Sequence, residues 1–182
     1  MLAVPVFLTG FMGVGKTKIG SIVARRLGRV FLDTDLMVEA RARKTVAALF
    51  AEEGEESFRQ LEHEAVAEAA NRTDAVVSLG GGAIAGARNR EVIQRSGVLV
   101  CIDADVETIM ARVSRREDRP LLAGLSPEAR RARIESLLAE RTPFYACADV
   151  RVTSTETRPA EATAEILLSR LEEWSAQHPR RA

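Results

Sequence analysis

The stretch Gly10-Phe-Met-Gly-Val-Gly-Lys-Thr17 decides the fold class of this chain. It follows an apolar run, Val4–Thr9, that is typical of a buried strand, and it leads into a segment with helical spacing, Lys16–Leu27. Its pattern is G-x-x-x-x-G-K-[ST], in which the glycines let the backbone turn successive N–H groups toward an anion. The start of the helix adds further N–H donors and a positive dipole end. The sequence therefore predicts a phosphate-binding loop between a strand and a helix, and a coincidental glycine turn is the alternative.

The motif also predicts roles for individual residues. Lys16 is one of only three lysines among 26 basic residues, so a lysine at this position is informative. We expect its ammonium to reach the β- and γ-phosphates of ATP, and the Thr17 hydroxyl to bind Mg²⁺. The residues predicted to contact ATP in this stretch are Gly10, Met12, Gly13, Val14, Gly15, Lys16, Thr17 and Lys18.

Strand-like and helix-like segments alternate along the rest of the chain. The further predicted strands are Val30–Leu32, Ala75–Leu79, Val98–Ile102 and Val150–Thr153. The further predicted helices are Leu36–Arg43, Val46–Glu53, Ser57–Asn71, Arg88–Arg95, Val106–Arg115, Pro127–Arg141 and Ala160–Gln177. This order predicts an α/β sandwich with a parallel sheet and right-handed crossovers. We expect residues 1–174 to form one domain and residues 175–182 to be a frayed tail.

Composition narrows the possible partners. The formal net charge is zero, and no apolar run approaches the roughly 20 residues that span a bilayer. Cys101 lies in an apolar run and is interpreted as a small core residue, which favours a reducing compartment. We expect a cytoplasmic monomer with no nucleic-acid or membrane partner. His63 is interpreted as a helix-surface residue and His178 as part of the tail, and neither indicates a metal site.

Two acidic residues follow the second predicted strand, in Asp33-Thr-Asp35. Strand alternation would place both carboxylates on one side, at the edge of the sheet where α/β proteins bind ligands. One could hold Mg²⁺ through water and the other could contact an acceptor hydroxyl. The alternative is a helix cap, for which Asp35 is suited. For the similar pair Asp103-Ala-Asp105 we favour capping.

Arginine is so common in this chain, at 23 residues, that each one is first interpreted as surface. This applies to Arg59 and Arg141, which lie on predicted helices. Arg119 differs because it lies in Ser114–Leu125, a charged segment with proline and glycine that we expect to form a mobile lid. An arginine on such a loop could neutralise charge on a transferring phosphoryl group.

Two other nucleotide motifs are weaker. Gly80-Gly-Gly-Ala-Ile-Ala85, with Asp103 about 20 residues further on, resembles a dinucleotide-binding loop, but it lies in the third strand–helix unit. Asn71-Arg-Thr-Asp74 resembles the guanine-reading segment of GTPases, but it precedes a strand and lacks the lysine.

Taken together, these segments resemble shikimate kinase, a member of the nucleoside-monophosphate-kinase-like group of P-loop proteins. The segments that carry the resemblance are Gly10–Thr17, Asp33–Asp35, Phe58-Arg59-x-x-Glu62, Ser78–Ala83, Arg119–Leu122 and Arg141-x-Pro-x-Tyr145. Each is unspecific alone, but the ordered set spans almost the whole chain and is specific. The resemblance implies a five-stranded parallel sheet of order 2-3-1-4-5. It also implies ATP-dependent phosphorylation of the shikimate 3-hydroxyl, on the pathway to chorismate.

On the substrate side, the resemblance implies that Asp35 hydrogen-bonds the acceptor hydroxyls and is the candidate base, while Asp33 holds the Mg²⁺ shell. Arg59 and Arg141 would clamp the substrate carboxylate, which suits a planar guanidinium pair. The glycine loop would bring backbone N–H groups against the ring substituents, from Gly80, Gly81 and Gly82.

On the nucleotide side, Arg119 would be the lid arginine and would join Lys16 and Asp35 as a catalytic residue. Arg112 would stack on adenine, and Arg158 would belong to the adenine pocket. The chain departs from the family at this pocket, because Thr153 stands where an aspartate is usual.

Other functions remain to be weighed. Gluconate kinase is the nearest alternative, although a carboxylate-binding arginine pair beside Gly80–Gly82 would be hard to explain there. A nucleoside-monophosphate kinase would need a base-reading pocket, which the sequence does not show. A nucleotide sensor without turnover would have no use for Lys16, Asp35 and Arg119 together.

Overall fold

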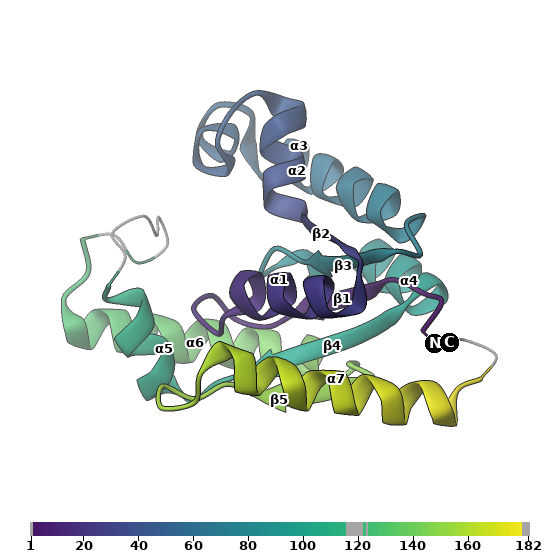
Figure 1. Cartoon of the computed structure of the whole chain (residues 1–182). Coiled ribbons are helices and arrows are strands. Elements are labelled where there is room, and N and C mark those ends of the chain that lie inside the picture. The colour runs from purple at the N-terminus through teal and green to yellow at the C-terminus, as the bar shows by residue number, and fades with distance from the viewer. Residues whose placement is uncertain (1, 116–121, 123, 180–182) are drawn as a thin grey trace.

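The chain folds around one sheet of five parallel strands, seen in a computed structural model that describes residues 2–115, 122 and 124–179. The strand order is β2-β3-β1-β4-β5, so the predicted order is confirmed (Figure 1). The strands are β1 Val6–Thr9, β2 Val30–Asp33, β3 Ala75–Ser78, β4 Val98–Asp103 and β5 Val150–Thr153. Arg119 and most of the predicted lid lie outside the described residues.

Seven helices and one short 3₁₀ turn are present in the described part of the chain. They are α1 Lys16–Leu27, α2 Thr34–Ala42, α3 Val46–Ala70, η1 Ala83–Ala85, α4 Ala87–Ser96, α5 Val106–Val113, α6 Pro127–Tyr145 and α7 Ala160–Gln177. None of the helices described is both long and apolar enough to cross a membrane.

Alternate residues of the central strands supply two separate cores. On β1, Val6 and Leu8 belong to a buried cluster with residues of α1 and α7, whereas Phe7 packs with residues of α3 and α4. Cys101 on β4 is fully buried in the second cluster, which confirms its interpretation as a core residue. Both faces of the sheet are therefore apolar, as a parallel sheet covered by helices on both sides requires.

The helix α3 is bent where the sequence predicted two helices. Gly54 has φ 82° and ψ 177°, a conformation that glycine adopts without the steric cost of a side chain. Residues on both sides of this bend pack on α2 through a third buried cluster that includes Val38, Leu49 and Phe58. Figure 1 shows this α2–α3 unit projecting beyond the sheet, above the ends of the central strands.

Several helix ends differ from the prediction. The helix α2 begins at Thr34, two residues early, because Asp33 caps it. The helix α6 continues through Pro143 to Tyr145.

The predicted cap at Asp105 is confirmed, since its carboxylate accepts a 2.7 Å hydrogen bond from the Thr108 N–H. At the end of α7, His178 Nδ1 lies 2.9 Å from the Trp174 carbonyl oxygen.

Candidate active site

The phosphate loop has the backbone that its glycines predict. Gly10, Gly13 and Gly15 have φ of 138°, 82° and 100°, values that other residues rarely adopt. A methyl group on Gly10 would lie 2.3 Å from the carbonyl oxygen of Ile102, so this position also requires the absence of a side chain. Lys16 Nζ donates to the carbonyl oxygens of Gly10 (2.8 Å) and Phe11 (3.1 Å), which holds the ammonium across the loop.

Asp33 connects this loop with the end of β2. One carboxylate oxygen, Oδ1, accepts a 3.1 Å hydrogen bond from the Asp35 N–H and thereby caps α2. The other, Oδ2, lies 3.4 Å from Thr17 Oγ1. The helix cap is therefore Asp33, and the alternative in which Asp35 caps the helix is wrong. A hydroxyl and a carboxylate oxygen this close together, beside a phosphate loop, fit the oxygen ligands that Mg²⁺ prefers.

Asp35 lies in the first turn of α2, so the expectation that strand alternation aligns it with Asp33 is wrong. The chain has already turned into a helix at Thr34, and the two carboxylates point to different places. A methyl group built on Gly80 would lie 2.5 Å from Asp35 Oδ1. Asp33 therefore faces the phosphate loop, while Asp35 faces the glycine loop that follows β3.

Two arginines from different helices meet at the same glycine loop. A methyl group on Gly81 would lie 3.0 Å from Arg141 Nη1, and one on Gly82 would lie 3.2 Å from Arg59 Nη1. Arg141 comes from α6 and Arg59 from α3. The Arg141 guanidinium also lies 5.5 Å from the centre of the Phe11 ring, within the range of a cation–π contact. The structure thus brings together Asp35, Arg59 and Arg141, which the sequence separates widely.

The glycine loop is held by a residue that sequence reasoning missed. Thr34 is fully buried, and its Oγ1 accepts a 3.0 Å hydrogen bond from the Gly80 N–H. The N–H of Gly80 is therefore engaged within the protein, and the expectation that it faces the substrate is wrong. Tyr145 supports the next residue, because its hydroxyl donates to the Gly81 carbonyl oxygen at 3.3 Å. The only sequence signal for Thr34 was its place between the two aspartates.

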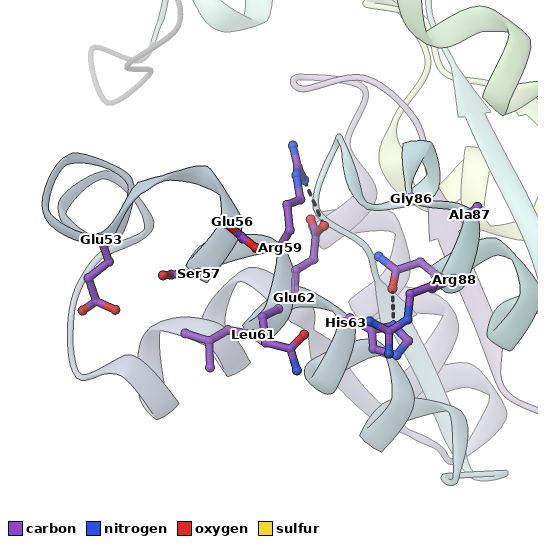
Figure 2. Close-up of a pocket in the computed structure, with 12 residues that line it drawn as sticks. Glu53, Glu56, Ser57, Arg59, Leu61, Glu62, His63, Gly86, Ala87 and Arg88 are labelled. Carbon is purple, nitrogen blue, oxygen red and sulfur yellow. Dashed lines mark hydrogen bonds and ion pairs between the residues drawn. The ribbon is translucent and has the colours of Figure 1, made fainter.

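Glu62 is the second residue whose importance the sequence did not show, although it belongs to the quoted motif. Its side chain is 2% exposed, and its carboxylate lies 2.9 Å from Arg59 Nη1 (Figure 2). Burial raises the pKa of the Glu62 carboxyl; the positive charge of Arg59 opposes this rise, and the negative charge of Asp35 adds to it. Glu62 therefore holds the Arg59 guanidinium on the side that faces Gly82, and its spacing of three residues from Arg59 on a helix was the available signal.

Arg112 lies at the other end of the phosphate loop. Its guanidinium donates to the Gly13 carbonyl oxygen (3.1 Å), to Ser154 Oγ (3.0 Å) and to the Thr155 carbonyl oxygen (2.7 Å). Arg158 donates to the Thr153 carbonyl oxygen at 2.8 Å. Arg112 thus joins the phosphate loop to the segment after β5, the segment in which the adenine pocket is predicted. Lys18, also a predicted ATP contact, is exposed in the first turn of α1.

Comparison with known proteins shows which family the chain matches. The family model described as shikimate kinase matches residues 12–172. This chain belongs to the shikimate kinase family. It is 45% identical over 165 residues to shikimate kinase of Symbiobacterium thermophilum, covering 89% of this chain and 93% of that protein. It is 42% identical over 176 residues to shikimate kinase of Gloeobacter violaceus, covering 95% of this chain and 97% of that protein.

Solved shikimate kinases have the same fold. The crystal structure of shikimate kinase from Bacteroides thetaiotaomicron superposes with a TM-score of 0.88 at 35% identity, covering 93% of this chain and 98% of that one. Shikimate kinase from Acinetobacter baumannii, solved in complex with shikimate, superposes with a TM-score of 0.85 at 34% identity and covers 93% of both chains. A gluconokinase from Sinorhizobium meliloti reaches a TM-score of 0.57 at 16% identity, a likeness that shows the fold alone.

The family assignment also decides between the nucleotide motifs. A kinase of this family uses ATP and not a dinucleotide cofactor, which argues against the dinucleotide interpretation of Gly80–Ala85. In this structure that segment faces Asp35 and two arginines instead. Asp103, the acid that a dinucleotide site would have used, forms an ion pair with Arg151 at 2.8 Å.

Proposed function

We propose that this chain transfers the γ-phosphoryl group of ATP to the 3-hydroxyl of shikimate, giving shikimate 3-phosphate and ADP. The observation that carries the proposal is the convergence of Asp35, Arg59 and Arg141 on one glycine loop beside the phosphate loop. Shikimate has one carboxylate and vicinal hydroxyls. Two guanidinium groups suit the carboxylate, and a carboxylate such as Asp35 suits a hydroxyl that must lose its proton. Membership of the shikimate kinase family supports the same substrate.

The residues would divide the reaction as follows. Lys16 and the N–H groups of the phosphate loop bind the β- and γ-phosphates, and Lys16 stabilises the charge that develops on the transferring group. Asp35 accepts the proton of the attacking hydroxyl or orients that hydroxyl toward the γ-phosphorus. Thr17 and Asp33 would hold Mg²⁺, which when bound neutralises phosphate charge.

The proposal also covers the adenine end of the nucleotide site, the lid, the oligomeric state and the location of the protein. Arg112 and Arg158 would border the adenine, supported by their contacts with the phosphate loop and with residues 153–155. Arg119 would close over the phosphates as part of the lid at 114–125, within a single domain at 1–174. We propose a cytoplasmic monomer whose partners are the small molecules ATP and shikimate.

A substrate screen tests the proposal directly. We expect Mg²⁺-dependent ADP release with shikimate, and little with gluconate or AMP. The shikimate ring holds its carboxylate and its 3-hydroxyl at a fixed separation, whereas gluconate is a flexible open chain and AMP has no carboxylate. A coupled ADP-release assay measures this, and product analysis locates the new phosphate. Faster turnover of gluconate than of shikimate would contradict the substrate assignment but not the phosphate-loop interpretation.

The two arginines give a second test of substrate identity. We expect Arg59→Lys and Arg141→Lys each to raise the shikimate KM by roughly 10- to 100-fold, because lysine cannot form a bidentate fork on a carboxylate. Isothermal titration with ATP should show unchanged affinity. The matched control is Arg170→Lys on the exposed face of α7, where the arginine pairs only with Glu173 among the ion pairs described. Unchanged shikimate affinity in both variants would mean that these arginines are ordinary surface residues and do not bind the substrate.

A further inference from the structure

His63 is only partly exposed, and it makes a contact that its interpretation as a helix-surface residue did not predict. It follows Glu62 on α3, is half-buried, and its Nδ1 lies 2.8 Å from Oδ1 of Asn89 on α4. Asn89 is 4% exposed, and its Nδ2 donates a 3.0 Å hydrogen bond to the Ala83 carbonyl oxygen. The dashed contact at the His63 ring can be followed in Figure 2. Two side chains therefore link α3 to the residue that follows Gly82.

The donors and acceptors in this link can be assigned. A carbonyl oxygen only accepts, so Asn89 must turn its NH₂ group toward Ala83. Its Oδ1 then faces His63 and needs a donor, since an unpaired acceptor at a buried site is costly. His63 must therefore carry a proton on Nδ1. The chain of donation runs in one direction, from His63 through Asn89 to the carbonyl of Ala83.

The link joins the two parts of the carboxylate-binding site. The helix α3 carries Arg59, and the loop carries Gly82, whose added methyl would lie 3.2 Å from Arg59 Nη1. His63 and Asn89 also line the groove of about 850 Å³ that Arg59 and Glu62 border. Thr34 is hydrogen-bonded to Gly80, the first residue of the same loop, and Asn89 is hydrogen-bonded to Ala83, the residue that follows its last glycine. A shift of α3 against the loop would change the distance between Arg59 and the glycine backbone.

We propose that His63 and Asn89 are positioning residues for shikimate, which keep Arg59 in register with the loop Gly80–Gly82. They act through Arg59 and the loop and do not touch the reacting atoms. The inference rests on the proposed function, because it needs a substrate whose carboxylate lies at Arg59.

Three substitutions at His63 test the link. Asparagine can place an N–H donor where Nδ1 stands, glutamine places one nearer the position of Nε2, and leucine provides none. We expect His63→Leu and His63→Gln to raise the shikimate KM by about 3- to 10-fold, the effect of losing one ordinary hydrogen bond, while His63→Asn stays within about twofold of wild type. The KM for ATP should not change in any of them. The control is His178→Leu, at the distant end of α7.

A double-mutant cycle distinguishes positioning from general support of the fold. Asn89→Leu should raise the shikimate KM as His63→Leu does, and the double variant should be no worse than Asn89→Leu alone, because both remove the same link. Lower melting temperatures with unchanged shikimate KM in both single variants would overturn the proposal. If His63→Leu does not fold, the comparison of His63→Asn with His63→Gln decides, and equal KM values in those two would also overturn it.

The tautomer gives a readout that does not depend on activity. In ¹⁵N spectra of the wild-type enzyme recorded at alkaline pH, His63 should be protonated on Nδ1. The variant His178→Leu assigns the signal, because the chain has only two histidines. An Nε2–H tautomer at His63 would overturn the direction of the link. Absence of shikimate turnover in the wild type would instead contradict the proposed function, so the two failures are distinguishable.

Discussion

Lys16→Ala should lower kcat by about 10³-fold or more, the scale of losing a cation aimed at a transferring phosphoryl group. Lys16 Nζ already lies across the phosphate loop, 2.8 Å from the Gly10 carbonyl oxygen and 3.1 Å from that of Phe11. With ATP bound, we expect this ammonium to counter the charge of the β- and γ-phosphates. Steady-state ADP release measures the loss, and circular dichroism should show an unchanged helix content.

The matched control for this variant is Lys44→Ala. This substitution also removes one positive charge. Lys44 lies at the surface beside Glu52 and Glu53, however, with Nζ–carboxylate distances of 2.9 and 2.7 Å. The turnover rate of Lys44→Ala should stay within about twofold of wild type, as for surface substitutions in general. A folded Lys16→Ala enzyme that retains a near-wild-type rate would contradict the phosphate-loop role.

Asp35→Asn should lower kcat by about 10²- to 10⁴-fold, the usual contribution of a positioned base, and leave ATP affinity little changed. The substitution preserves the shape of the side chain beside Gly80 and removes only the charge that favours proton acceptance. Single-turnover rates at saturating shikimate measure the chemical step separately from binding.

Asp33→Asn is the informative comparison, because it makes the same chemical change two residues away. Asparagine still caps a helix well, so α2 should remain intact. The carboxylate oxygen 3.4 Å from Thr17 Oγ1 is lost, and we therefore expect a higher Mg²⁺ requirement with kcat largely restored at high Mg²⁺. If metal titrations showed a higher Mg²⁺ requirement for Asp35→Asn than for Asp33→Asn, the division of roles between the two aspartates would be wrong.

The phosphate loop could be predicted from residue order because its interactions are local. The left-handed backbone at Gly10, Gly13 and Gly15 favours glycine at each of these positions, and Lys16 contacts carbonyls only five and six residues away. The alternation of apolar strands with helices was equally local, and α1 and α7 have the bounds that periodicity predicted. The strand order and the substrate came from the family resemblance of the ordered motifs, because no local pattern states which strands pair.

The grouping of side chains on the proposed substrate side could be seen only in the tertiary structure. By residue type and helical position alone, Arg59 and Arg141 could not be told from the other arginines, and only the family resemblance singled them out. The structure shows α3 and α6 bringing both to one glycine loop. Strand alternation misplaced Asp35, because a cap at Asp33 starts α2 before the strand could continue.

The residues next to Thr34 and His63 in the sequence do not indicate their hydrogen-bond partners. The Gly80 N–H that Thr34 binds is 46 residues away, and the Asn89 that His63 contacts is 26 residues away. Residue types and short spacings determine a turn, a cap or a phosphate loop, since those contacts form within a few residues. Which distant side chains meet depends on how the helices stack on the sheet, so packing over the whole chain decided that Asp35, Arg59 and Arg141 meet at one glycine loop.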